Sequence, residues 1–324
     1  MGHSKATNMP HDTETGGWEP WANRASFSIV SGCYYLTTAA MAVCLYFGWV
    51  WPLVSLVLVA SHFMHAMLIA FHEAAHGILR DNRAWNEFDG LLVGTISLTP
   101  LTLYRVLHQQ HHVNVATEKD VELWPFVDPK EPLWWRRLAA FLELNFGFFY
   151  TPWLLWRFFF TRNSPITNRR ARRRIWLEFW LMVAFWALLL GAVAWFGVWK
   201  WFLVLYFIPA FIAGNMQSWR KYIEHVGLSG HTGRSATRSI VNVDWKGKCV
   251  SISLLHQPLH GVHHIKGSLP YHEMPAHTHL LVPTDEGDTV PFPNYRAAFA
   301  DLLKCLADPR VGSQWNRAQT APAA

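Results

Sequence analysis

Eight histidines in three short clusters are the residues of this sequence best suited to chemistry. The clusters are His72-Glu73-Ala74-Ala75-His76, His108-Gln109-Gln110-His111-His112 and His260-Gly261-Val262-His263-His264. Residues three or four apart share one face of a helix, so each cluster can aim its imidazoles at a common point. The adjacent histidines of the second and third clusters diverge by about a third of a turn and can reach different ions, which favours two metals over one. Imidazole binds iron, zinc, copper and nickel, so the clusters predict a metal-dependent enzyme.

The composition predicts that these clusters belong to a membrane protein. Of the 324 residues, 51% are hydrophobic and only 15% are charged, against about 25% charged in an average soluble domain. The net charge is +6, and the densest run of basic residues consists of Arg169, Arg170, Arg172, Arg173 and Arg174. Because this run directly precedes an apolar segment, we interpret it as a membrane anchor and not as a nucleic-acid-binding face.

Four apolar segments are long enough to cross a bilayer, which takes about 20 residues. They form two helical hairpins, residues 28–49 with 51–71 and residues 175–195 with 199–215. Residues 91–103 are short and carry Gly, Thr and Pro, which favours a buried or re-entrant segment. Residues 134–160 mix Trp with Arg, which favours a helix lying in the interface, with a tilted crossing as the alternative.

Four crossings place both termini on one side of the membrane, and the basic residues identify that side. Arg24, the run at residues 169–174, Arg220 and Lys221 fall on it, whereas the opposite turns hold only Lys200. The positive-inside rule makes that side cytoplasmic, and all three clusters fall there as well. We therefore predict an all-α integral membrane protein of a bacterial inner membrane, with two transmembrane hairpins, interfacial helices and a cytoplasmic histidine-rich cap.

The expected organisation is one membrane domain between two tails. The domain covers residues 26–310, the flexible polar N-terminal tail residues 1–25, and the disordered C-terminal tail residues 311–324.

The clusters and their surroundings resemble the membrane fatty acid desaturase family. The forms His-x-x-x-His, His-x-x-His-His and His-x-x-His-His, flanking two transmembrane hairpins, are typical of it. Further matching residues are Asn86-Glu87, Asp120 and Pro270-Tyr271-His272-Glu273-Met274-Pro275-Ala276-His277. The likeness runs from about Trp51 to His277. It is specific for the superfamily and not for a substrate, since related hydroxylases, ketolases and decarbonylating enzymes share the boxes.

The resemblance implies a non-haem di-iron enzyme that uses O2 to introduce a double bond into a fatty acyl chain of a lipid or acyl thioester. It implies that the iron ligands are His72, His76, His108, His111, His112, His260, His263 and His264. The family commonly adds one histidine before the third box, for which His225 in Tyr222-Ile223-Glu224-His225 is the candidate. That phrase also resembles the membrane alkane hydroxylases, so hydroxylation of an alkyl or isoprenoid chain is the alternative. Their second box has a different spacing, which favours the desaturase.

A separate electron donor is expected, because the sequence contains no His-Pro-Gly-Gly motif of a fused cytochrome b5 domain. A ferredoxin or a rubredoxin would fit this role. The other expected partners are the lipid substrate and the membrane, and the sequence does not indicate an oligomeric state.

Polar residues near the boxes are candidates for orienting the imidazoles, because a ligating histidine usually donates its second ring N–H to a carboxylate or carbonyl. Glu73, Asp120 and Glu224 are the carboxylates in question. His256 lies one helical turn before the third box, and Asn215, at the end of the fourth span, is a candidate for holding a metal-bound water.

Two other hypotheses use fewer of these residues. The first cluster also matches the zinc-protease signature, in which Glu73 would be the general base and Asp89 a third ligand. A catalytic zinc needs only three protein ligands, so an intramembrane protease would leave six of the cluster histidines unused. A metal transporter would need ligands at membrane depth, whereas these clusters lie outside the spans.

Overall fold

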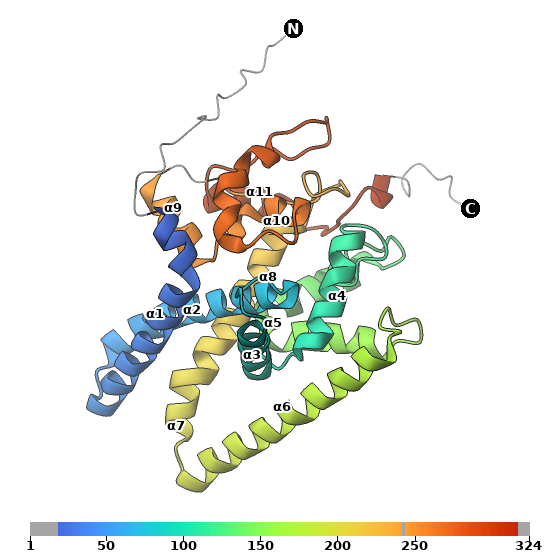
Figure 1. Cartoon of the computed structure of the whole chain (residues 1–324). Helices are drawn as coiled ribbons and strands as arrows, with labels where there is room; N and C mark the ends of the chain where they lie inside the picture. Colours follow the sequence, from blue (N-terminus) through green and yellow to red (C-terminus); the bar gives the residue numbers. More distant parts are fainter. Residues whose placement is uncertain (1–18, 242–243, 317–324) are drawn as a thin grey trace.

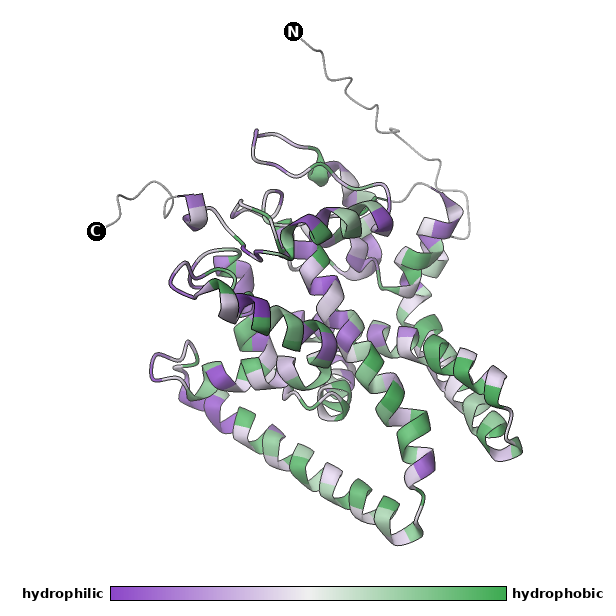
Figure 2. Cartoon of the chain, turned by 180° about the vertical axis from the view of Figure 1, so that it is seen from behind, coloured by the Kyte–Doolittle hydropathy of each residue, from purple (hydrophilic) through white to green (hydrophobic). Residues whose placement is uncertain are grey.

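The computed structural model describes residues 19–241 and 244–316, and over these ranges it is helical, with one isolated bridge between Ile240 and Phe292 and no strand. Long helices form the membrane part in the lower half of Figure 1, and shorter helices and loops form a cap above them. Hydrophobic residues dominate the long helices, while hydrophilic residues gather in the cap (Figure 2). The predicted all-α membrane fold is confirmed.

The folded region extends beyond the predicted domain bounds at both ends. The first helix begins at Glu19, inside the segment predicted as a tail, and Ser26 near its start is fully buried. In the predicted C-terminal tail, Trp315 is buried and its indole donates to the carbonyl of Phe126 (2.8 Å). Residues 1–18 and 317–324, which make up most of the two predicted tails, lie outside the described residues.

The helices α1 (Glu19–Phe47) and α2 (Val50–His76) form the first hairpin. Gly48 makes the turn with a φ of +71°, a left-handed conformation that glycine adopts without steric cost. From its rise per residue, α2 is about 40 Å long, whereas the hydrocarbon core is about 30 Å thick. Its last turns, with His72 and His76, can therefore extend beyond the hydrocarbon.

The helices α3 (Arg83–Ile96) and α4 (Leu101–Asn114) meet at a sharp corner of 98°. Thr99 N–H donates to the carbonyl of Gly94 (2.8 Å), and Leu98 between them has a φ of +60°. Trp186 and Tyr206 donate from neighbouring helices to the carbonyls of Thr95 and Ile96. This corner is the segment predicted as buried or re-entrant, and it delivers α4 with the second box.

Among the residues that the structure describes, five helices are long and apolar enough to cross a membrane, and the α3–α4 pair would be a sixth span if counted as one. They are α1, α2, α5 (Leu133–Phe160), α6 (Arg169–Phe196) and the continuous run of α7 (Trp199–Phe202), η1 (Leu203–Phe207) and α8 (Ile208–His225). The two predicted hairpins account for four of the five. The fifth is α5, which was predicted to lie in the interface, with a tilted crossing as the alternative. Its length and composition are compatible with the crossing, so both alternatives stand.

Two glycines bring α5 and α8 into close contact. A Cβ on Gly214 would lie 2.7 Å from the Cα of Phe148, and a Cβ on Gly147 would lie 2.7 Å from the carbonyl oxygen of Gly214. Small residues allow the backbones of membrane helices to approach in this way. Since α8 also packs against α2, it occupies the centre of the bundle and brings His225 close to the end of α2.

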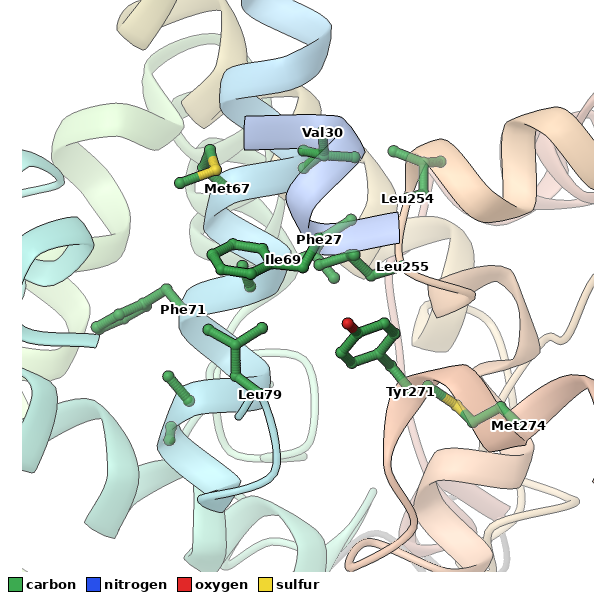
Figure 3. Packing of buried hydrophobic residues seen from close by; sticks show 14 of the residues in the cluster. Phe27, Val30, Met67, Ile69, Phe71, Leu79, Leu254, Leu255, Tyr271 and Met274 are labelled. Atoms are coloured by element: carbon green, nitrogen blue, oxygen red, sulfur yellow. The ribbon is translucent and has the colours of Figure 1, made fainter. Parts of the chain in front are cut away.

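The cap holds the third box over the end of α2. Its elements are α9 (Trp245–Ser253), η2 (Gln257–Leu259), α10 (His260–Ile265), η3 (Tyr271–Leu281) and α11 (Tyr295–Cys305). Figure 3 shows Leu255 and Tyr271 of the cap beside Phe27 of α1 and Ile69 of α2, all within one buried cluster. Full burial of such a side chain contributes roughly 1.5–3 kcal/mol, so this contact fixes the cap on the first hairpin.

Candidate metal centre

The nine predicted histidines meet at one place between the membrane helices and the cap. His72 and His76 come from the end of α2, His225 is the last residue of α8, and the others come from α4 and α10. Six of the nine are buried, and His76, His112 and His264 are half-buried. Three segments that are distant in sequence thus converge with α2 at the boundary of the membrane part.

The ligand atoms fall into two groups, each able to hold a metal ion. The first contains His72, His76, His108, His112 and His263. The second consists of His111, His225 and His264 together with the overlapping set Glu224, His225 and His260. Within each set the candidate atoms lie within 4.8 Å of one another. The adjacent histidines of the second and third boxes belong to different groups.

The distances between the ring nitrogens fit ligands around an ion. His112 Nε2 lies 3.0 Å from both His108 Nε2 and His263 Nε2. His260 Nε2 lies 2.9 Å from His225 Nε2 and 3.0 Å from His264 Nε2. A ring nitrogen carries either one proton or one lone pair, so it can form only one of its two short contacts as a hydrogen bond. Metal coordination explains both contacts, because two nitrogens about 2.1 Å from a common ion and at right angles to each other lie about 3.0 Å apart. The donor set, almost all imidazole, suits iron and the neighbouring late transition metals.

Several of the histidines have a partner at the second ring nitrogen of the kind that metal ligands use, whereas the Nδ1 atoms of His263 and His264 are buried without one. His72 Nδ1 lies 3.0 Å from Glu73 and His108 Nδ1 lies 2.9 Å from Glu122. His225 Nδ1 lies 2.9 Å from the carbonyl oxygen of Ala236. These acceptors hold each ring with Nδ1 protonated and with Nε2 free to bind a metal.

His260 has the same arrangement once the amide of Gln257 is considered. Its Nδ1 lies 2.7 Å from the Nε2 atom of Gln257, while Gln257 Oε1 is buried without a partner. The oxygen and nitrogen of an amide are assigned from the hydrogen-bond network. Rotating this amide by half a turn gives the Nδ1–H of His260 an acceptor, in exchange for the hydrogen bond that the amide makes with Glu224.

Burial keeps the imidazoles of the third box neutral. It lowers the pKa of His260, His263 and His264 well below the ordinary value of 6.5, and neighbouring imidazoles lower it further. A neutral imidazole is the form that binds a metal. Burial also raises the pKa of Glu122 to about 7.

The five polar residues proposed around the ligands occupy different positions. Glu73 and Asp120 contact His72 and His111. Glu224 lies on the metal side, 3.6 Å from His260 Nε2, and its carboxylate pairs with Arg220 (2.6 Å). These three therefore belong to the centre.

Asn215 and His256 form their hydrogen bonds with groups other than the ring nitrogens of the nine predicted ligands. Asn215 accepts from Gly147 N–H (2.9 Å) and donates to the carbonyl of Asn145 (2.9 Å), at the kink of α5. His256 Nδ1 contacts Ser251 Oγ (2.9 Å), and its Nε2 is buried without a partner. Asp89, the third ligand of the protease hypothesis, pairs with Arg80 (2.8 Å).

Two residues of the centre were not predicted from the sequence, Glu122 and Gln257. Glu122 stands two residues after Asp120, and both contact ligands of the second box. An acidic pair at this spacing, just after a box, was a usable signal. Gln257 carries no such signal, because its contact with His260 depends on the short η2 turn.

An apolar pocket lies among the membrane helices below the candidate metal centre. Its walls come from α2, α3, α5 and α8, with Met64, Phe148 and Ala210 among the lining residues. A second, polar pocket is lined by ligands of both groups and by charged residues of α8. The two pockets share Tyr104, Thr151, Leu155 and Gln217, so they adjoin each other between the membrane helices and the histidines.

Comparison with known proteins agrees with this arrangement. The family model described as fatty acid desaturase matches residues 15–302. No curated protein matches the chain.

Proposed function

Because the chain belongs to the fatty acid desaturase family, we propose that it is a non-haem di-iron oxidoreductase that uses O2 to introduce a double bond into a fatty acyl chain. The observation that carries the proposal is the division of the nine histidines into two groups of ligand atoms, beside a polar pocket that adjoins an apolar one. Two irons bound there would supply the oxidising power needed to remove hydrogen from an unactivated methylene. The protein supplies the neutral imidazoles, their orientation and an enclosed site.

The acidic residues around the histidines have the role of orienting the rings. Glu73, Asp120 and Glu122 accept from the Nδ1 atoms of His72, His111 and His108. A carboxylate in this position fixes the ring and makes its other nitrogen a stronger ligand. Glu224 faces the second group directly and is the one carboxylate that we propose as an additional ligand or as the partner of a bound water.

The apolar pocket is the proposed binding site of the acyl chain. Burial of the chain contributes about 0.8 kcal/mol for each methylene, so the pocket recognises length better than the head group. The residues shared with the polar pocket, above all Tyr104 and Gln217, would lie next to the reacting carbons. The acyl carrier is accordingly a lipid or a thioester, whose polar end would remain outside the apolar walls.

Hydroxylation of an alkyl or isoprenoid chain is the second candidate function. It is favoured by one observation, the position of Glu224 beside His260, within the Tyr-x-Glu-His phrase that resembles the membrane alkane hydroxylases. Both reactions would begin with removal of a hydrogen from a carbon of the chain bound in the same pocket. The identity of the product therefore distinguishes them.

We further propose that the metal centre and both termini face the cytoplasm of a bacterial cell, and that a ferredoxin or rubredoxin delivers the electrons. The basic residues at the start of α6 support this orientation, since Arg169, Arg170 and Arg173 are exposed at one end of a candidate span and positive charge favours the cytoplasmic side.

The test is a lipid profile by gas chromatography and mass spectrometry. A bacterial host would express the chain with a ferredoxin pathway, beside the same host with the His111→Ala variant. A new double bond that disappears in the variant is the expected result and gives its position. A new hydroxyl group would support the second candidate. Purified protein that contains one zinc and no iron would contradict both and support the protease.

A further inference from the structure

The two helices that end at the metal centre each have carbonyl groups to satisfy. An α-helix leaves its last four carbonyls without partners inside the helix, and buried carbonyls need them. The last turn of α2 holds Ala74 and Ala75 between the ligands His72 and His76. The last turn of α8 holds Ile223 and Glu224 next to His225. In both cases backbone N–H groups of the following residues satisfy some of these carbonyls, and an arginine from another segment supplies further donors.

Arg105 of α4 completes the end of α2. Its Nε donates to the carbonyl of Ala75 (2.9 Å) and an Nη donates to the carbonyl of Ala74 (3.1 Å). Asn86 of α3 adds a bond from its amide to the same Ala74 carbonyl (3.0 Å). On α4, Arg105 stands three residues before His108, on nearly the same face of the helix. The arginine thus ties the first box directly to the helix that carries the second.

Arg105 is itself fixed by a chain of charged contacts. Its guanidinium pairs with Glu87 of α3 (2.5 Å), and Glu87 pairs with Arg174 of α6 (2.5 Å). Arg174 pairs with Glu178 (2.9 Å). Glu178 returns to α4, where it accepts from the backbone N–H (2.8 Å) and the hydroxyl (2.6 Å) of Thr102. The chain begins and ends on α4, which leaves Arg105 little freedom.

Arg238 completes the end of α8 in the same way. Its guanidinium donates to the carbonyls of Ile223 (3.2 Å) and Val226 (2.6 Å), and its backbone N–H donates to the carbonyl of Glu224 (2.7 Å). Its other face pairs with Asp301 of α11 at 2.9–3.0 Å. The side chain is almost fully buried, with 1% exposed.

The segment that carries Arg238 also holds the third box. Gly261 N–H in that box donates to Ser239 Oγ (2.8 Å), and Ile240 N–H donates to the carbonyl of Pro258 (2.7 Å). A single short strip of chain, residues 236–240, therefore binds the end of α8 on one side and the start of α10 on the other. Ala236 at its beginning accepts from the ring of His225.

Each arginine acts mainly on one of the two groups of ligands. Arg105 joins α2 and α4, which carry four of the five histidines of the first group and, with His111, one of the second. Arg238 joins α8 and the third box, which carry His225, His260 and His264 of the second group and, with His263, one of the first. We propose that Arg105 and Arg238 are positioning residues, each setting the spacing of the ligands of one metal site before the metal binds. This inference rests on the proposed function, because it takes the two groups as metal sites.

The guanidinium group is suited to this task. It presents five N–H donors in a rigid plane, so it can bind two carbonyls and a carboxylate together. Its charge also interacts favourably with the negative end of a helix dipole. A lysine offers a single point charge and cannot hold the same three acceptors at fixed angles.

The experiment compares Arg105→Gln with Arg238→Gln, so that each variant is the matched control of the other. Metal-free protein would be reloaded with ferrous iron and followed by binding titration and Mössbauer spectroscopy. His263→Ala and His225→Ala would identify the signals of the first and second sites. Arg105→Gln should weaken the first site and Arg238→Gln the second, by about tenfold or more, as for loss of other groups that orient ligands. Each Lys variant should recover only part of the loss.

Several outcomes would overturn the inference. Full affinity at both sites in both variants would show that the arginines do not set the ligand spacing. Equal weakening of both sites by either variant would indicate a general loss of structure, which thermal unfolding of the metal-free proteins would detect. If Arg238→Gln does not fold, Asp301→Asn, which loosens the same arginine, replaces it with the same expected selectivity. Wild-type protein that binds no iron would contradict the proposed function itself, and the inference with it.

Discussion

His111 and Asp120 are joined by a doubly accepted contact, in which the Nδ1 atom of the ring lies 2.9 Å from Oδ1 and 2.8 Å from Oδ2. The carboxylate is buried, and it also accepts from the backbone N–H groups of Ala116 (3.0 Å) and Glu122 (3.1 Å). Asp120 therefore orients His111, a proposed ligand of the second group, and shapes the loop that follows the second box.

Replacing Asp120 by Asn should weaken iron binding at the second group by about 10–100-fold, the usual cost of losing such a partner. The amide retains the size of the side chain but loses the charge that holds the ring. The measurement is an iron-binding titration with turnover measured alongside. Glu118→Gln is the control, because Glu118 is exposed on the same loop. Equal affinity in Asp120→Asn and wild type would contradict the assigned role.

His111→Ala and His263→Ala should each abolish turnover while the protein remains in the membrane. Each removes one ligand from a different group, and both groups are needed if the irons act together. Each variant should retain about half of the wild-type iron, since metal affinity depends on the full ligand set. Membrane fractionation, iron analysis and the lipid profile provide the three measurements. Substantial turnover in either variant would show that the residue is not an essential ligand.

Replacing Ala210 by Leu should shift the enzyme towards shorter acyl chains. Ala210 lines the apolar pocket and lies fifteen residues before His225 on α8, or about 22 Å from it along the helix. A larger side chain there shortens the deep end of the pocket, and each excluded methylene loses about 0.8 kcal/mol of burial. Competition between chain lengths gives the measurement. Ala187→Leu, on an exposed position of α6, should leave the chain-length profile unchanged.

Replacing Gly214 by Ala should destabilise the protein by roughly 1–3 kcal/mol, the usual cost of overpacking. The added Cβ would lie 2.7–2.8 Å from backbone atoms of Phe148, which cannot move without separating α5 from α8. Thermal unfolding in detergent measures the effect. Gly191→Ala on α6 is the matched control, because a Cβ there meets nothing within 4 Å. Equal melting temperatures of the two variants would contradict the tight α5–α8 contact.

The contact between Arg136 of α5 and Asp308 of the C-terminal segment should weaken at low pH, because Asp308 becomes protonated. Burial alone would raise the pKa of Asp308, but Arg310 and Arg136 more than offset it and hold the pKa below 3.8. A carboxyl group whose pKa is lower in the folded state than in the unfolded state stabilises the folded state. This contribution is complete above the unfolded pKa and is lost as the pH falls through the folded pKa. Melting temperatures between pH 7 and pH 3 should therefore fall more for wild type than for Asp308→Asn. Parallel curves would show that this carboxylate contributes nothing.

The sequence predicted those features that depend on local geometry. Helical spacing is sufficient to bring His108, His111 and His112 to one end of a helix, and length and hydropathy are sufficient to identify the two hairpins. Asp120 and Glu73 were found for the same reason, since each lies close in sequence to the histidine that it contacts.

The features that the sequence did not reveal depend on contacts between distant segments. Asn215 accepts from the N–H of Gly147, directly after the kink of α5 at Phe146, and no local pattern placed that kink. Arg105 and Arg238 each bind carbonyls that are 12 to 31 residues away. Neither arginine belongs to a box. Every residue has a backbone carbonyl, so the sequence does not indicate which carbonyl groups an arginine binds.

The position of α6 at the edge of the bundle places one support of the metal centre against the lipid. Only 11% of its most apolar part is buried in the protein, and in Figure 1 it runs along the lower edge, away from α1 and α2. Its apolar residues 175–195 span about 32 Å, close to the hydrocarbon thickness of about 30 Å. Its first turns carry Arg174 and Glu178, which bind Glu87 of α3 and Thr102 of α4. The helix of the second box is therefore held in part by an element that supplies no ligand and has mostly lipid for neighbours.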